Sequence, residues 1–117
     1  MPVDIDQTVA HLRARDAARR ERAARRAKGL RALIPEAARM VRDRFGAKRV
    51  WVFGSLATGE VHEASDVDLA VERMVAAVYF EALSSLMQHF PCDVDLVRLE
   101  EAPDSLRDRV REQGVAA

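Results

Sequence analysis

Residues 50–72 read VWVFGSLATGEVHEASDVDLAVE, two strand-like stretches joined by a turn and a polar loop. The first stretch, residues 50–53, is wholly apolar and rich in residues that favour strands, which is typical of a strand covered on both faces. Gly54 and Ser55 end it, and a short helix is expected over residues 55–58. Residues 66–72 alternate between polar and apolar side chains, as a second strand does. The segment therefore predicts strand, short helix, loop and strand.

The N-terminal part of the chain is predicted to be a basic helical arm. Residues 1–29 are rich in Ala and Arg, and both favour helix. Over residues 13–28 the only apolar residue is Ala, so this part can bury little surface and is expected to be exposed. Gly29 and Pro35 interrupt the pattern. We therefore expect an arm over residues 1–29 and a folded domain over residues 30–117.

The remaining pattern predicts helices and one more strand around the central segment. Apolar residues recur at helical spacing on both sides of it, and Gly and Pro residues mark the ends of the predicted elements. The order helix, strand, short helix, strand, helix, strand, helix predicts a small α/β domain. The further elements are a helix over residues 30–45 capped by Gly46, a helix over 74–90 ended by Pro91, a strand over 92–99 and a helix over 104–113.

Composition predicts a folded protein in a reducing, cytoplasmic setting. The chain has 117 residues, and 49% of them are hydrophobic and 32% charged, which argues for one folded domain. Cys92 is the single cysteine and cannot form an internal disulfide. The first six residues lack the basic and apolar parts of a signal peptide. No apolar run approaches the roughly 20 residues that span a bilayer, so no membrane contact is expected.

The formal net charge of zero is the sum of two unlike parts. Residues 13–49 hold 14 basic and four acidic side chains, and the other residues hold five basic and 15 acidic ones. Such asymmetry indicates a basic contact surface joined to an acidic part that can bind metal.

The acidic part contains a pattern that suits metal binding. Asp66 and Asp68 are two positions apart on a strand, so their side chains point to the same face. Two close carboxylates repel each other, and a cation removes that cost. Such oxygen ligands suit Mg²⁺. A third carboxylate from the strand over residues 92–99 would allow two ions about 3.5–4 Å apart, the arrangement used for displacement at phosphorus.

The turn after the first strand supplies the features of a phosphate site. Gly54 lacks a Cβ and lets a phosphate approach the backbone. A helix that starts at Ser55 directs its free N–H groups at that phosphate, and the Ser55 hydroxyl can add a hydrogen bond. A phosphate cradle and a carboxylate cluster on adjacent strands favour a nucleotidyl transferase.

Gly-Ser, a ten-residue spacer and Asp-x-Asp together resemble the motif of the minimal nucleotidyltransferase (MNT) proteins of the DNA polymerase β-like superfamily. The resemblance covers about residues 37–114 and implies a small mixed β-sheet flanked by helices. It implies that Gly54 and Ser55 bind nucleotide phosphate and that Asp66 and Asp68 bind metal. These residues stand in the family's order and spacing.

The same resemblance assigns a third carboxylate. The family's third strand reads apolar-Asp-apolar-apolar, which Asp95 and its neighbours match, so Asp95 is implied as a metal ligand and as the base for the attacking hydroxyl. Asp93 lies on the same face of that strand and stays the reserve candidate. Ser65, directly before Asp66, also matches the motif, and either it helps to bind the nucleotide or it is a plain loop serine.

The activity implied by the resemblance is Mg²⁺-dependent transfer of AMP from ATP to a hydroxyl, with release of pyrophosphate. Single-domain MNT proteins are typically antitoxins paired with a HEPN-domain ribonuclease toxin, which they neutralise by adenylylating a tyrosine. The chain looks like such an antitoxin. By this resemblance, its cofactors are two Mg²⁺ ions, its substrate is ATP, and it forms a hetero-oligomer with the toxin.

Three alternatives stay open at this stage. Family members often read Gly-Ser-x-Ala-Arg-Gly, and Thr58 replaces that arginine here. The chain is therefore either an enzyme or a non-catalytic binding module that inhibits its partner by complex formation. A subunit that modifies a small molecule is the second alternative. Nucleic-acid binding by the arginine-rich arm is the third and less favoured one, because the arm has no aromatic residues to stack on bases.

Overall fold

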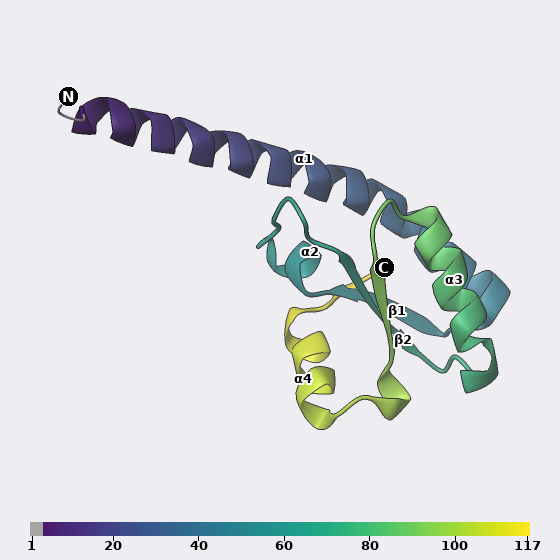
Figure 1. The fold of residues 1–117 in the computed structure, drawn as a ribbon. Coiled ribbons are helices and arrows are strands. Elements are labelled where there is room, and N and C mark those ends of the chain that lie inside the picture. Colours follow the sequence, from purple (N-terminus) through teal and green to yellow (C-terminus); the bar gives the residue numbers. More distant parts are fainter. Residues whose placement is uncertain (1–3) are drawn as a thin grey trace.

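A four-stranded mixed sheet with helices on both faces forms the body of the protein, and one long helix extends well beyond it (Figure 1). The computed structural model describes residues 4–117. The strand order is β3-β2-β1-β4, with β1 antiparallel to β2 and β4, and β2 parallel to β3. The mixed sheet expected from the sequence is thereby confirmed. The strands are β1 (Arg49–Phe53), β2 (Val67–Glu72), β3 (Val94–Arg98) and β4 (Val115–Ala116).

The two faces of the sheet pack against different helices. One face presents Val52, Leu69 and Leu96 to the main core, which α1 and α3 complete. The other face presents Phe53 and Ala70 to α4 in a smaller cluster. The alternation of side chains along each strand separates these two sets. The helices are α1 (Ile5–Phe45), α2 (Ser55–Thr58), α3 (Tyr79–His89) and α4 (Asp104–Gln113), with short 3₁₀ turns η1 (Ala76–Val78) and η2 (Leu99–Glu101).

Helix α1 runs unbroken through both residues that were expected to interrupt it. Gly29 and Pro35 lie inside its 41 residues, so the prediction of two helices is wrong. A proline inside a helix costs about 3 kcal/mol. Burial of the stripe that contains Leu30, Ile34 and Val41 outweighs this cost, because each such side chain contributes roughly 1.5–3 kcal/mol. The division into arm and domain at residue 29 stays a prediction, since no break in the helix marks it.

Three smaller expectations also differ from the structure. The helix expected over residues 74–90 begins only at Tyr79, after the turn η1. Val75 and Met87, whose spacing within residues 74–90 fits the packed side of such a helix, are 63% and 46% exposed. Strand β4 had no counterpart in the sequence prediction. The short helix α2 and the terminal helix α4 are confirmed.

Within residues 4–117, none of the helices combines the length and the apolar character that crossing a membrane requires.

Candidate active site

The end of β1 and the beginnings of β2 and β3 meet at one end of the sheet. In the antiparallel pair, Phe53 lies opposite Asp68, so β1 ends beside that carboxylate. In the parallel pair, Asp68 lies beside Asp95. Both aspartates occupy the face of the sheet that also carries α4, because they alternate with core residues such as Leu69. The strand register therefore brings the Asp-x-Asp strand and the third acidic strand together.

Gly54 is required where β1 passes Asp68. Its φ of +69° lies in the region that residues with a side chain rarely adopt. A Cβ added to this glycine would overlap Oδ2 of Asp68. The Asp68 carboxylate can therefore occupy this position only because residue 54 is glycine. Ser55 follows at once and begins α2, which ends at Gly59.

Negative charge accumulates around Asp68. Its side chain is half-buried, and that burial raises its pKa, as do the charges of Asp95 and Asp66. Asp66 and Asp95 are exposed. Within residues 4–117 no group of three acidic, histidine or cysteine side chains is already arranged around a metal position. The donor set nevertheless fits a hard divalent cation, because positive charge here would relieve the repulsion that raises the Asp68 pKa.

Ser65 shapes the loop that leads into β2. It is buried, and its Oγ accepts a hydrogen bond of 2.7 Å from the amide of His62. Its carbonyl oxygen accepts a hydrogen bond of 2.9 Å from Nε of Arg26. The Ser65 hydroxyl thus closes a turn directly before Asp66. Its part in nucleotide binding stays a prediction.

Two arginines of α1 donate hydrogen bonds to the motif segments, and the sequence pattern did not predict these contacts. Arg26 donates to the carbonyl of Ser65, and Arg31 donates through Nη2 to the carbonyl of Leu56 in α2 at 2.9 Å. These pairs lie 39 and 25 positions apart in the chain. Local periodicity carries no information at such distances, so only the folded structure reveals these contacts.

Two further residues from the sequence analysis are exposed: Asp93, the reserve candidate for the third carboxylate, and Thr58, which replaces the arginine of the family motif. Asp93 is exposed and precedes β3, and its carbonyl oxygen accepts a hydrogen bond of 3.2 Å from the amide of Val67. Thr58 is exposed at the end of α2, and its Oγ1 accepts a hydrogen bond of 3.4 Å from the amide of Glu60. Tyr79, at the start of α3, donates from its hydroxyl to the carbonyl of Leu96 at 2.6 Å.

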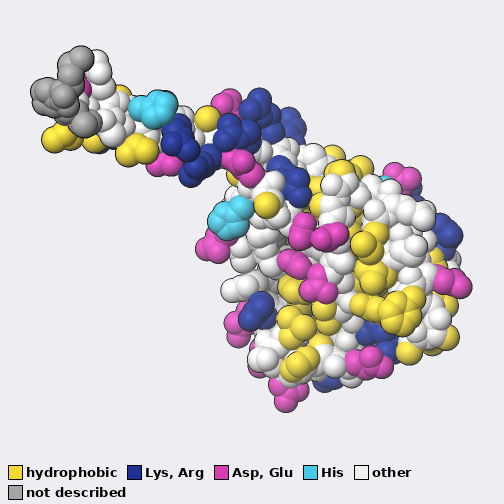
Figure 2. All heavy atoms as spheres, in the orientation of Figure 1, with side chains coloured by type: hydrophobic (Ala, Val, Ile, Leu, Met, Phe, Trp, Pro, Cys, Tyr) yellow, Lys and Arg dark blue, Asp and Glu magenta, His cyan; other side chains and the backbone are white. Residues whose placement is uncertain are grey.

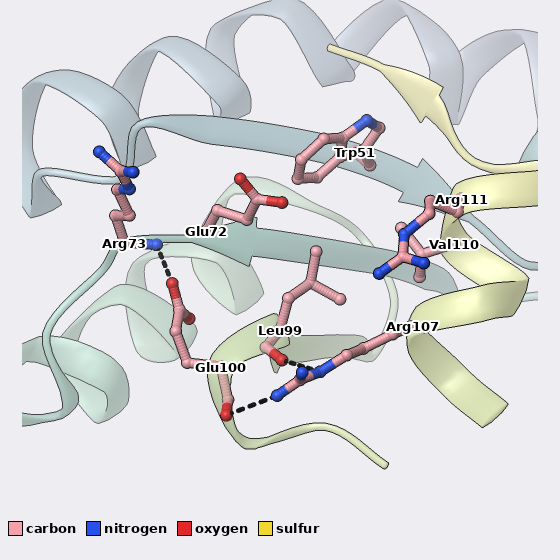
Figure 3. Close-up of a pocket in the computed structure, with 8 residues that line it drawn as sticks. All are labelled: Trp51, Glu72, Arg73, Leu99, Glu100, Arg107, Val110 and Arg111. Carbon is pink, nitrogen blue, oxygen red and sulfur yellow. Dashed lines mark hydrogen bonds between the residues drawn. The ribbon is translucent and has the colours of Figure 1, made fainter. Parts of the chain in front are cut away.

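A separate hollow lies further along the same face of the sheet (Figure 3). It has a volume of about 590 Å³, and Trp51, Glu72 and α4 line it. Arg107 spans its floor and donates to the carbonyls of Leu99 and Glu100 at 2.7 and 2.8 Å. Glu72 is four positions beyond Asp68 on β2, a distance of roughly 13 Å at 3.3 Å per residue. The hollow is therefore distinct from the carboxylate cluster.

Crowded carboxylates on two adjacent strands, beside a glycine that leaves room for them, define a nucleotidyltransferase type of domain on this mixed sheet. The family described as "Polymerase beta, Nucleotidyltransferase" matches residues 37–116, and the chain belongs to this family.

Similar proteins are found among both curated sequences and solved structures. The chain is 36% identical over 66 residues to "Protein adenylyltransferase MntA" from Thermococcus cleftensis, a match that covers 56% of this chain and 52% of the relative. It thus spans about half the length of that relative.

Two solved structures show the same fold. A structure described as a minimal nucleotidyltransferase has a TM-score of 0.63 and 33% identity, and the match covers 76% of this chain and 93% of that one. A crystal structure of a toxin–antitoxin with AMP-PNP has a TM-score of 0.60 and 30% identity, with 67% and 66% covered.

Proposed function

We propose that this protein is a Mg²⁺-dependent adenylyltransferase that transfers AMP from ATP to a hydroxyl of a partner toxin with a HEPN domain, and so acts as an antitoxin. The observation that carries the proposal is the register of Asp68 beside Asp95 at the end of the sheet where Gly54 leaves space. The similarity to a protein adenylyltransferase and to a toxin–antitoxin with AMP-PNP supports it.

The three carboxylates would hold two Mg²⁺ ions. Asp68 lies between Asp66, two positions before it on the same strand, and Asp95 on the next strand. Bound Mg²⁺ supplies positive charge that stabilises the negative charge developing on the phosphates. The pKa of Asp68 is raised because burial and neighbouring carboxylates disfavour its negative charge. A bound cation would therefore stabilise the charged form of this carboxylate.

The side chains around the phosphates orient the reaction. Gly54 has no side chain to block the approach of a phosphate to the backbone, and the Ser55 hydroxyl would donate to a phosphate oxygen. Asp95 accepts the proton of the attacking hydroxyl. The hydroxyl oxygen then bonds to the α-phosphorus, the bond to the bridging oxygen breaks, and pyrophosphate leaves. A reaction that needs ATP and Mg²⁺ fits the cytoplasm, which we propose as the compartment.

The direct test is a transfer assay. The protein is incubated with labelled ATP, Mg²⁺ and a co-expressed HEPN-domain protein encoded beside its gene, and intact mass spectrometry looks for the gain of one AMP on that protein. We expect the gain with the native chain and its loss in Asp66→Asn and Asp95→Asn. Asp108→Asn removes an exposed carboxylate from α4 and is the matched control. Loss in Asp93→Asn instead of Asp95→Asn would transfer the base role to Asp93.

One observation favours a second candidate function. Thr58 stands where relatives often carry an arginine, and its hydroxyl accepts a bond within its own turn. The protein would then neutralise its partner by binding alone. Tight co-purification of the two proteins, with no mass gain on the partner when any nucleoside triphosphate is supplied, would support this binding module.

A further inference from the structure

One face of α1 is apolar at its outer end and basic toward the domain. Ile5, Val9 and Leu12 follow one another at intervals of four and three residues, and they are 73%, 38% and 50% exposed. The same spacing continues through four arginines. Residues three or four positions apart are neighbours on a helix, so all seven side chains share one face. We name it the arm face; its basic part is Arg15, Arg19, Arg22 and Arg26.

The inner end of the arm face is attached to the loop of the candidate active site. Arg22 forms an ion pair of 2.9 Å with Glu63, and Arg26 donates to the carbonyl of Ser65. Ser65 immediately precedes Asp66 in the sequence. The arm face therefore starts at the loop that immediately precedes Asp66 and leads outward from it.

The outer arginines are unpaired. Within residues 4–117, neither Arg15 nor Arg19 takes part in an ion pair or a side-chain hydrogen bond. Arg19 lines a hollow of about 350 Å³ together with His62 and Glu63, so this side of the arm faces the loop before β2. Figure 2 shows Lys and Arg side chains gathered along the arm and acidic side chains on the body beside it.

We propose that the arm face docks an amphipathic helix of the acceptor protein, with acidic side chains opposite the arginines and apolar ones opposite Ile5, Val9 and Leu12. The inference deepens the proposed function and rests on its claim that the acceptor is a protein. Charge complementarity requires an acidic occupant along the basic part. The exposed apolar end requires apolar contacts, which a nucleic-acid backbone does not offer. A protein helix satisfies both.

The dimensions of the arm face agree with such an occupant. Residues 5–26 rise by roughly 32 Å at 1.5 Å per residue, the length of a partner helix of about 20 residues. An acceptor that lies along this face has its inner end next to the loop before Asp66. Docking there would bring its hydroxyl toward the carboxylates, which increases the effective concentration of the acceptor.

The first test measures binding to two defined probes by fluorescence anisotropy, with the full chain at about 0.15 M salt, where charges more than about 8 Å apart are largely screened. One probe is a synthetic helical peptide with Leu and then Glu residues at helical spacing, and the other is a single-stranded RNA of random sequence. We expect the peptide to bind more tightly than the RNA. We also expect the double variant Arg15→Glu and Arg19→Glu to weaken peptide binding by about tenfold or more.

The matched control changes the same charge elsewhere on the helix. Lys28 and Arg39 are exposed on α1 and lie outside the arm face, closer to the domain than any of its seven residues. The double variant Lys28→Glu and Arg39→Glu should change peptide affinity by less than about twofold, because salt screens charge effects at this separation. Circular dichroism checks that both variants keep their helix. Equal losses in the two variants, or tighter binding of RNA than of peptide, would overturn the proposal.

A second test joins the arm face to the transfer reaction. With the HEPN-domain acceptor, the variant with Arg15→Glu and Arg19→Glu should raise KM for the acceptor by about tenfold and leave KM for ATP unchanged. A merely structural role of the arm would move both. If the native chain transfers no AMP, the proposed function fails, while the peptide measurement still decides the role of the arm face.

Discussion

The two faces of the central sheet differ in the side chains that they accommodate: one face is apolar and buried, and the other carries charged residues. On β2, Val67, Leu69 and Val71 point into the main core and are fully buried. Asp68 and Glu72 alternate with these residues and point to the opposite face, where charge is retained. One strand of six residues therefore contributes buried apolar side chains to the core on one face and candidate site residues on the other. The alternation lets each side change with little effect on the other.

The largest expected effect is on the core face. Leu69→Ala should lower the free energy of unfolding by about 3–5 kcal/mol, because it opens a cavity at a fully buried position. Chemical denaturation measures this loss. Met87→Ala, at an exposed site on α3, should cost under about 0.5 kcal/mol. An equally small loss for Leu69→Ala would contradict the separation of the two faces.

Gly54→Ala is the corresponding change at the site. The added Cβ overlaps the Asp68 carboxylate, and the backbone at φ +69° and ψ −149° lies in a region that is essentially confined to glycine and costs other residues about 1–3 kcal/mol. We expect AMP transfer to fall roughly a hundredfold, which corresponds to about 2.7 kcal/mol.

Gly46→Ala is the control for this substitution. Gly46 has a φ of +77° but open space around its Cβ position, at the end of α1. Its backbone lies in the left-handed helical region, where a side chain costs about 1–2 kcal/mol, so thermal unfolding should show that loss while transfer stays unchanged. Equal loss of activity in both variants would mean that backbone strain, and not the carboxylate, explains Gly54.

Asp68→Asn should increase the stability of the metal-free fold and abolish its stabilisation by Mg²⁺. Without metal at neutral pH, the melting temperature should rise by roughly a few degrees, since the variant removes a charge that its neighbours repel. Added Mg²⁺ should stabilise the native chain and not the variant. Calorimetry with and without Mg²⁺ measures both effects. A native chain that Mg²⁺ leaves unchanged would contradict the assignment of the carboxylates.

The smallest effect is a pH dependence. Because the pKa of Asp68 is raised in the folded state, the unfolded state loses this proton first as pH rises. The stability linked to the proton is complete below the ordinary value near 3.8 and is lost as pH rises through the folded pKa. The melting-temperature difference between Asp68→Asn and the native chain should therefore be near zero at low pH and grow toward neutral pH. A constant difference would exclude this cause.

Local patterns account for the parts of the fold that were predicted correctly. The strands around Gly54 and the turn at α2 were found because alternation and glycine act within a few residues. Strand β4 was missed because two residues at the sheet edge have no periodicity. Pro35 misled the prediction because its local cost is outweighed by burial against distant strands.

The candidate site shows the same limit. The family motif singled out Asp66, Asp68 and Asp95, and the parallel register then placed Asp68 beside Asp95. The contacts of Arg26 and Arg31 depend on how α1 lies across the body, which no short window of sequence contains.

The unbroken helix α1 gives the arm a fixed geometry, in which every added residue both rotates and lengthens it. Because Gly29 and Pro35 introduce no break, rotation and advance are locked together from the core to the tip. One residue inserted before Arg22 would turn Ile5 and Arg15 by about 100° relative to the carboxylates and shift them by about 1.5 Å. Seven inserted residues would nearly restore the phase while moving the tip outward by roughly 10.5 Å. The reach of the arm can therefore be changed at nearly constant angular phase only in steps of about seven residues.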